Sequence, residues 1–263
     1  MSRSFIFGFA MGLALLLVVG VGASRLGQNN AEKAKQRAEL AAYQAELADA
    51  TPIDPGLLTE RQRNHSKLFS HYRQLNNDRT ITESIAQAKG HTQILGLNVG
   101  LGLGPAFINP ETPETHFADL AHASDAVIRG IVINRTSYIT EDEGFILTDY
   151  DISVSEVLKD NMTAAIPVGA RITFVNPGGK VVLDGIIVKA SDDAFIPLPR
   201  GNKDVVLFMK FISESGSYKA TRVGASFELE GSSLHPLTKE RFPEGVLQDA
   251  PSFLQTARQV SKR

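Results

Sequence analysis

The sequence predicts a mainly β C-terminal domain, a small antiparallel barrel or sandwich, preceded by an N-terminal transmembrane or signal helix and a helical stalk. Three observations predict this fold class. Residues 5–24 carry no ionisable side chain, residues 31–50 lack Gly and Pro, and segments after residue 125 alternate apolar and polar side chains. The chain is therefore divided into a membrane anchor or signal segment, 1–24; a helical stalk, 25–89; a Gly/Pro-rich connector, 90–115; a β-domain, 116–230; and a C-terminal tail, 231–263.

Composition excludes several classes of protein. Of the 263 residues, 43% are hydrophobic and 21% are charged, which is ordinary globular usage. Cys is absent, so disulfide scaffolds, Cys-ligated zinc and cysteine nucleophiles are ruled out. The formal net charge is −2 and Trp is absent. Because nucleic-acid grooves are basic and use stacked aromatic side chains, we expect no nucleic-acid partner.

The apolar run from Phe5 to Ser24 predicts that the chain has the membrane as a partner. As a helix this run spans about 30 Å, the hydrocarbon thickness of a bilayer. It is longer than the apolar part of a signal peptide, and residues 20–23 offer only fair small-residue cleavage sites. An uncleaved anchor is therefore favoured, and a cleaved signal peptide is the alternative.

The basic residues around this run leave two orientations open. Arg25, Lys33, Lys35 and Arg37 follow the run and outnumber Arg3 before it. The positive-inside rule alone would then place the C-terminal side in the cytoplasm. A short N-terminal anchor followed by a long polar domain is nevertheless most often exported. We expect the C-terminal domain to be extracytoplasmic.

The helical stalk is predicted to contain two helices. The first, over 31–50, consists mainly of Ala, Glu, Lys, Gln and Leu. Leu40, Tyr43 and Leu47 give it a thin apolar stripe, which would suit a partner helix but is more typical of a solvated stalk. Pro and Gly residues at 52–56 end this helix.

The second predicted helix, over 57–75, is basic. Its apolar face is expected at Leu68, Tyr72 and Leu75, and its charged face could lie on anionic lipid or a partner, although such faces are more often solvated. The connector that follows contains a Gly-rich run at 100–104. This run lacks the Gly-Lys-Ser/Thr of a phosphate-binding loop, so we interpret it as a connector or an irregular edge strand.

The β-domain is predicted from period-two alternation between turn signals. A short helix is expected over 114–123. The clearest strand is 145–155, with Ile146 and Tyr150 on an apolar face and Asp149 and Asp151 on a wet face. The other expected strands are 126–134, 170–175, 180–189, 205–212, 218–223 and 226–229. In the tail, a last helix is expected over 252–262, either packed on the β-domain or free.

Five stretches of the sequence, 125–132, 148–159, 168–174, 177–179 and 205–210, carry a resemblance. They begin strands, end a strand with Glu-Val-Leu-Lys and form a Gly-Gly hairpin. Residues of about 120–230 resemble an uncharacterised bacterial exported β-domain and are loosely similar to netrin-like or OB-like barrels. Taken with the apolar run from Phe5 to Ser24, the resemblance implies a location at the bacterial cell membrane by a single N-terminal span, or a secreted or periplasmic protein after signal cleavage. Metalloproteinase inhibitors of the netrin-like type use an N-terminal cysteine, which this chain lacks.

His116, Asp119, His122 and Asp125 form a loose cluster of metal-ligating side chains. Their spacing of three and six residues holds them only approximately on one helix face, a weak metal arrangement. A helix that enters the β-domain explains them more simply. No metal or other cofactor is predicted.

Candidate catalytic residues also fall in no recognised motif. Asp149 and Asp151 share one strand face with Cα atoms about 6.5–7 Å apart, which suits paired-carboxylate chemistry or Ca²⁺ but also a solvated face. The acidic stretch 141–143 is interpreted as a hairpin tip. No G-x-S-x-G occurs, and Ser155 and Lys159 are one residue too far apart for S-x-x-K. A Ser–His–Asp set assembled across the fold stays open, because triads are defined by geometry. No catalytic residue is assigned.

The sequence favours a non-enzymatic, envelope-located binding or adaptor protein that presents the β-domain to an envelope protein partner. One alternative is an extracytoplasmic hydrolase that uses carboxylate or His residues of the β-domain. A second alternative is a structural membrane protein that oligomerises through helices in residues 31–75.

Overall fold

The computed structural model describes residues 32–53, 57–70, 80–89, 94–98, 112–191, 194–199, 201–239, 242, 246–247 and 249–261. The chain forms two compact units, Met1–Asp49 and Ala50–Arg263. The predicted membrane segment, Phe5 to Ser24, and the Gly-rich run at 100–104 lie outside the described residues.

The described part of the first unit is one helix, which covers residues 32–49 and confirms the predicted helix. Lys35 and Glu39 lie one turn apart on it, with 3.9 Å between Nζ and Oε1. Leu40 and Leu47 of the predicted stripe are 57% and 41% exposed. Neither this helix nor any other within the described ranges has the length and apolarity needed to cross a bilayer.

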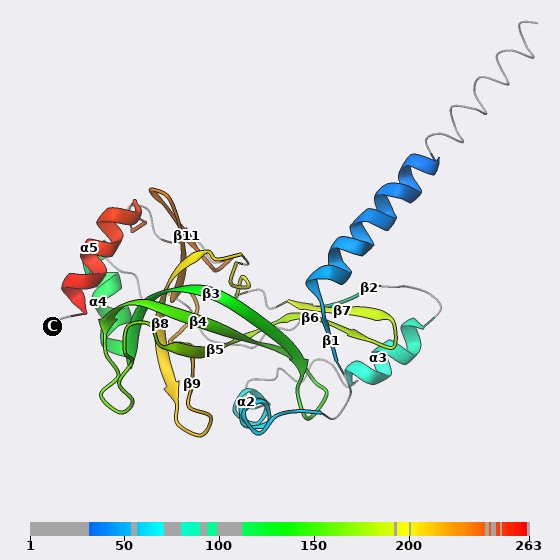
Figure 1. Cartoon of the computed structure of the whole chain (residues 1–263), viewed down its shortest axis with the longest axis horizontal. Coiled ribbons are helices and arrows are strands. Elements are labelled where there is room, and N and C mark those ends of the chain that lie inside the picture. The colour runs from blue at the N-terminus through cyan, green and yellow to red at the C-terminus, as the bar shows by residue number, and fades with distance from the viewer. Residues whose placement is uncertain are drawn as a thin grey trace, which may run out of the picture. The chain divides into compact units, whose positions relative to one another are not determined.

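Seven strands form the larger sheet of the second unit (Figure 1). In order of neighbours they are β11 (Ser233–Pro236), β10 (Ser226–Glu230), β8 (Asp204–Ile212), β3 (Ala126–Ile139), β4 (Ile146–Lys159), β5 (Arg171–Pro177) and β9 (Ser217–Ala220). Neighbours are antiparallel except β5 and β9, which are parallel. β9 also pairs with β8, so the sheet curls back towards its own middle. Every predicted strand except 180–189 corresponds to one of these strands.

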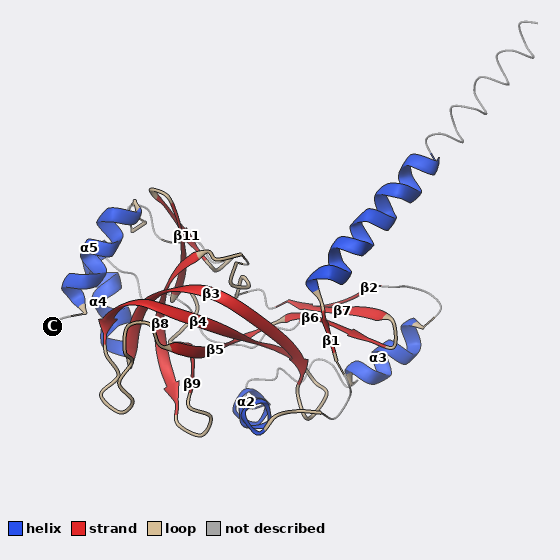
Figure 2. Ribbon diagram, in the orientation of Figure 1, coloured by secondary structure: helices blue, strands red, loops and turns tan. Residues whose placement is uncertain are grey.

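The two longest strands, β3 and β4, are strongly curved (Figure 2). Their ladder contains register shifts, which add local twist. At one shift, a Cβ on Gly130 would lie 2.7 Å from both Ile152 Cγ2 and the carbonyl oxygen of Ser153. From Asn134 onward β3 pairs with β4 alone, so its outer half has one edge without a neighbouring strand.

Four strands form the smaller sheet, in the order β1 (Thr51–Pro52), β6 (Gly179–Leu183), β7 (Ile186–Ser191) and β2 (Ile94–Asn98). The prediction of one strand over 180–189 is wrong. Asp184 and Gly185 have φ angles of 50° and 76° and turn the chain into the β6–β7 hairpin. β1 and β2, from the predicted stalk and connector, add to this hairpin in parallel.

The two sheets meet at Gly179. Its φ is 144°, and a Cβ there would overlap the hydroxyl groups of Ser137 and Thr148. The Thr148 hydroxyl donates to the carbonyl oxygen of Gly178 at 2.7 Å and lies 2.8 Å from the Ser137 hydroxyl. A side chain larger than hydrogen would therefore separate β6 from β3 and β4.

Two helices cover one end of the larger sheet. α4 (Pro113–Ala123) confirms the helix expected over 114–123 and begins at a capping box formed by Thr112 and Thr115. α5 (Ala250–Val260), from the predicted tail, packs beside α4. Their core contains the rings of Phe117, Phe208, Phe227 and Phe253. The tail is therefore part of the compact unit.

Two further helices lie near the other end of β3 and β4. α3 (Ile81–Ala88) starts at the capping box of Thr80 and Glu83 and buries Ile81 and Ile85 against the smaller sheet. α2 (Glu60–Ser70) confirms the helix predicted over 57–75 in part: it begins three residues later than predicted, and residues 71–75 lie outside the described residues.

The fold prediction is correct as a mainly β C-terminal region, but the single barrel or sandwich is corrected to two sheets. Two physical causes explain the difference. The tight turn at Asp184 and Gly185 splits one expected strand into a hairpin. Parallel pairing then recruits β1 and β2, and strands of two and five residues show little alternation in the sequence.

Candidate functional site

Helix α2 lies over the outer half of β3 and β4 and brings polar side chains to the sheet. Its first turn is fixed by Thr59 and Gln62, whose side chains each accept from the other's backbone N–H, at 3.2 and 2.9 Å. Gln62, His65, Ser66 and Phe69 form its buried face, at spacings of three and four residues. This face differs from the one predicted at Leu68, Tyr72 and Leu75, of which the last two lie outside the described residues.

His65 is the centre of a buried polar cluster. Its side chain is fully buried, and Nδ1 lies 3.1 Å from Asp149 Oδ1 and 3.0 Å from the Tyr138 hydroxyl. On the other side of the ring, Nε2 lies 2.6 Å from Ser217 Oγ and 3.0 Å from Ser215 Oγ. An ionised carboxylate only accepts hydrogen bonds, so the geometry suits a neutral ring that donates from Nδ1 to Asp149 and accepts at Nε2. We call Tyr138, Asp149, His65, Ser215 and Ser217 the His65 cluster.

Asp149 is the anion of this cluster. The expectation of a wet strand face is wrong here, because α2 covers the strand and Asp149 is 4% exposed. Tyr138 donates to Asp149 Oδ1 at 3.2 Å, and Arg61 Nε lies 3.3 Å from Oδ2 as an ion pair without hydrogen-bond geometry. Burial, followed by the negative charge of Asp149, raises the pKa of Tyr138 well above its usual range.

The order of groups in the His65 cluster is that of an activated serine: hydroxyl, imidazole, carboxylate. Ser217 is fully buried, whereas Ser215, in the turn between β8 and β9, is partly exposed. Their hydroxyl oxygens are 2.6 Å apart. The cluster also joins α2 to β3, β4 and the β8–β9 hairpin, so it holds α2 against the sheet.

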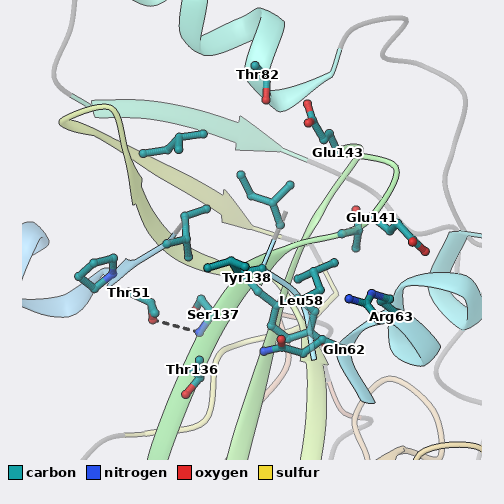
Figure 3. Close-up of a pocket in the computed structure, with 16 residues that line it drawn as sticks. Thr51, Leu58, Gln62, Arg63, Thr82, Thr136, Ser137, Tyr138, Glu141 and Glu143 are labelled. Atoms are coloured by element: carbon teal, nitrogen blue, oxygen red, sulfur yellow. Dashed lines mark hydrogen bonds between the residues drawn. The ribbon is translucent and has the colours of Figure 1, made fainter. Parts of the chain in front are cut away.

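A cavity of about 440 Å³ lies beside the cluster, between β1, α2 and the outer half of β3 (Figure 3). We call it the β3 cavity. Leu58, Ile139 and Leu183 are among its apolar lining residues. Tyr138 belongs to both sites, because it lines the cavity while its hydroxyl contacts His65 and Asp149. The remaining lining residues are Thr51, Pro52, Ile53, Leu57, Gln62, Arg63, Thr82, Thr136, Ser137, Thr140, Glu141 and Glu143.

One wall of the β3 cavity is the free edge of β3. In an antiparallel ladder, successive residues point their backbone groups alternately towards and away from the partner strand. Ser137 N–H points away from β4, because it donates to Thr51 Oγ1 at 3.0 Å. Two positions on, Ile139 points the same way. Glu141, two further, donates its N–H to Ser66 Oγ of α2 at 3.3 Å.

Ile139 therefore lies between two edge positions that side chains already satisfy. Its own N–H has no hydrogen-bond partner among the residues that the structure describes. The residue is half-buried and lines the cavity. A backbone N–H that is buried away from water without a partner is uncommon in native proteins, so a ligand that covers Ile139 is expected to pair with it.

Three charged side chains lie around the β3 cavity: Arg63 of α2, and Glu141 and Glu143 of the turn between β3 and β4. The turn confirms the hairpin tip expected at 141–143. Within the described ranges none of the three side chains forms an ion pair. Together they give the cavity one more negative than positive charge.

The other predicted candidates are dispersed. Burial, followed by the charge of Arg222, lowers the pKa of His116 to about 4, and its ring packs against Phe117 and Phe242. Asp125 accepts from Lys210 Nζ and from the N–H of Phe211, at 2.8 and 2.9 Å. In the described part of the chain no three His, Asp or Glu side chains are placed to hold a metal ion.

Two further candidates make local contacts. Asp151 faces the amide of Asn134 at 3.4 Å, and Ser155 donates to the carbonyl oxygen of Arg129 at 3.1 Å. Asp149 and Asp151 are thus not a working pair, because one is buried under α2 and the other is half-buried beside Asn134. Of the predicted candidates, Asp149 belongs to the His65 cluster, and Glu141 and Glu143 of the acidic stretch line the β3 cavity.

Sequence reasoning missed His65, Tyr138, Ser215 and Ser217. His65 precedes Tyr138 by 73 residues and Ser217 by 152, so no local spacing joins them. The available signal was the buried face of α2, where His65 and Phe69 are four residues apart.

The sequence matches no protein-family model and no curated protein.

Proposed function

We propose that the chain is a non-enzymatic binding protein of the cell envelope that takes its ligand in the β3 cavity. The observation that carries this proposal is the cavity itself. Its volume of about 440 Å³ falls in the range of ligand sites, and its lining combines apolar side chains with polar and charged ones. The Phe5–Ser24 segment supports a membrane-anchored or exported location.

An OB-like architecture is part of the proposal. Its support is the strand order β3-β4-β5-β9-β8 within the curled sheet, in which only β5 and β9 are parallel. In this proposal the OB-like part is the scaffold, and the smaller sheet and α2 are additions that build the cavity.

Site-specific photo-crosslinking in the native membrane tests the proposal. The photoreactive residue p-benzoylphenylalanine replaces Leu58 inside the cavity, and Met162, which is fully exposed, in the control. We expect a discrete adduct from position 58 that is absent from position 162. Leu183→Trp, which fills the cavity, should abolish it. No adduct from position 58, or one unaffected by Leu183→Trp, would contradict the proposal.

A second candidate is an acyl hydrolase in which Ser215 is the nucleophile. The specific observation in its favour is the geometry of Ser215, His65 and Asp149. Ser215 Oγ would bond to the acyl carbon as the ester C–O bond breaks, and its proton would pass to His65 Nε2 and then to the leaving alcohol. Water would release the acyl group by the reverse proton path.

A fluorophosphonate probe separates this candidate from the binding protein. A nucleophilic serine displaces fluoride and keeps the phosphonate as an O–P ester, which intact-mass spectrometry detects. The hydrolase predicts labelling that Ser215→Ala removes and Ser217→Ala preserves in part. An unlabelled chain with an intact fold would exclude it.

A further inference from the structure

We infer that the ligand of the β3 cavity is an extended segment of a partner protein, which adds as a short strand to the outer edge of β3 at Ile139. This inference rests on the proposed binding function and names the class of its ligand. It begins from the unpaired N–H of Ile139, which a small apolar molecule would leave without a partner.

The edge at Ile139 has the hydrogen-bonding pattern of strand addition. In an antiparallel pair, two opposed residues exchange both backbone bonds. Ile139 offers this exchange to one residue of an incoming segment. At the adjacent outward positions, Thr51 occupies the N–H of Ser137 and Ser66 occupies that of Glu141. The site is therefore short and has one central position.

The cavity also suits the side chains of an extended segment. Successive side chains of a strand point to opposite faces. The cavity that Ile139 lines also presents apolar side chains of Ile53, directly after β1, Leu58, shortly before α2, and Leu183, at the end of β6. Backbone pairing combined with pockets for alternate side chains is the general form of recognition by strand addition.

Charge selects the composition of the segment. Glu141 and Glu143 lie at the β3–β4 turn, as Figure 3 shows, and Arg63 is the cation of the lining. Neither glutamate has an ion pair within the described residues. A Lys or Arg side chain near the end of the segment that faces this turn would complement them.

The experiment uses the full chain in detergent and a displayed library of random short peptides. Peptides that bind the natural chain are kept, and those that also bind the Leu58→Trp variant are removed. The strongest binder is then synthesised with one backbone nitrogen methylated at a time, and its affinity is measured by fluorescence anisotropy. We expect one position at which methylation weakens binding by about tenfold or more, with near-neutral effects at both neighbours. Binding should also slow amide exchange at Ile139.

Charge variants provide the second arm. Glu141→Gln and Glu143→Gln should each weaken a Lys- or Arg-containing binder by about two- to tenfold at low salt. Glu114→Gln is the matched control, because Glu114 lies in α4, outside the cavity lining. A binder that is equally sensitive to all three variants would contradict the charge argument.

The outcomes separate this inference from the proposed function. A peptide that is lost on Leu58→Trp but tolerates methylation at every position would overturn strand addition and leave the cavity as a ligand site. The same holds if N-phenyl-1-naphthylamine binds in the cavity and no peptide is selected. If neither the peptides nor this apolar dye bind to the cavity, both proposals fail.

Discussion

Tyr138 takes part in two features of the molecule. Its ring lines the β3 cavity, and its hydroxyl donates to Asp149, which contacts His65. A change that moves α2 therefore affects the cavity wall and the His65 cluster together. At the scale of single residues, the wall of the cavity is held in place by the His65 cluster. The side chains of this cluster form their hydrogen bonds chiefly with one another.

His65→Ala should destabilise the chain by about 2–4 kcal/mol. The substitution removes one hydrogen-bonding partner from each of the buried groups of Asp149 and Ser217 and opens a void under α2. Chemical denaturation measures the free energy of unfolding. His122→Ala, at an exposed position, is the control and should change it by less than about 0.5 kcal/mol. Equal effects of the two substitutions would show that the cluster contributes nothing to stability.

His116 should make stability depend on pH. Its pKa falls from 6.5 to about 4 in the folded chain, so the unfolded chain binds the proton more readily between these values. The contribution of neutral His116 to the free energy of unfolding is fully present above pH 6.5. It decreases as the pH falls towards 4, by about 2–3 kcal/mol in total.

The measurement compares the natural chain with His116→Phe in denaturant titrations at several pH values. The variant keeps an aromatic ring against Phe117 and Phe242 but cannot titrate. The difference in unfolding free energy between the two chains should change over this pH window. A difference that is independent of pH would refute the assignment.

The residues of the site show which side chains could be predicted as buried from the sequence and which could not. The alternation correctly predicted that Ile146 and Tyr150 of β4 are buried. Tyr150 lies in the core of the larger sheet, whereas Ile146 packs with side chains of α3 and the smaller sheet. The same alternation predicted that Asp149 is exposed to solvent. Nothing in the local pattern indicates that α2, whose His65 precedes Asp149 by 84 residues, covers it. Burial by a distant element leaves no periodic signal in the strand that it covers.

At the scale of elements, the β6–β7 hairpin determines where the cavity lies. It leaves the larger sheet at Pro177, passes Gly179 and pairs with β1, which contributes Thr51 to the cavity. The Gly-Gly hairpin expected at 177–179 is wrong: this stretch links β5 to β6, which lie in different sheets, and the hairpin turns at Asp184 and Gly185. The strands β1 and β2 that pair with the hairpin were not visible in the sequence. Pairing between β1 and β6 joins residues that are 130 positions apart in the sequence, and it involves two residue pairs only.

Gly179→Ala should destabilise the chain by about 3 kcal/mol or more. Its Cβ would meet the Ser137 and Thr148 hydroxyls, at a φ that side chains rarely adopt. Gly96→Ala is the matched control, since that Cβ would have no atom within 4 Å. Thermal unfolding followed by circular dichroism distinguishes the two. A tolerated Gly179→Ala would mean that the sheets are not in close contact there.

At the scale of the whole molecule, the buried cores found among the described residues belong to the second unit, residues 50–263. The four larger clusters draw on α2 to α5 and on both sheets. None includes a residue of the helix at 32–49, whose apolar stripe stays exposed. The order of a stalk followed by a β-domain could be predicted from composition. The inclusion of residues 50–115 in the β unit could not, because it depends on long-range parallel pairing.

A fragment of residues 50–263 should therefore unfold at the same temperature as the full chain, within about 2 °C. Differential scanning calorimetry of both proteins in one detergent checks this expectation. A substantially lower midpoint for the fragment would mean that residues 1–49 contribute to the stability of the second unit.

Because the sequence contains no tryptophan, the fluorescence of a single introduced Trp can report on the β3 cavity. Leu57 lines the cavity and is 74% exposed, so an indole at that position could sit at the rim without filling the space. Because the chain has no other Trp, the emission of Leu57→Trp would come from this rim alone. Occupation of the cavity could then be followed in the intact chain, in real time and with an unlabelled ligand.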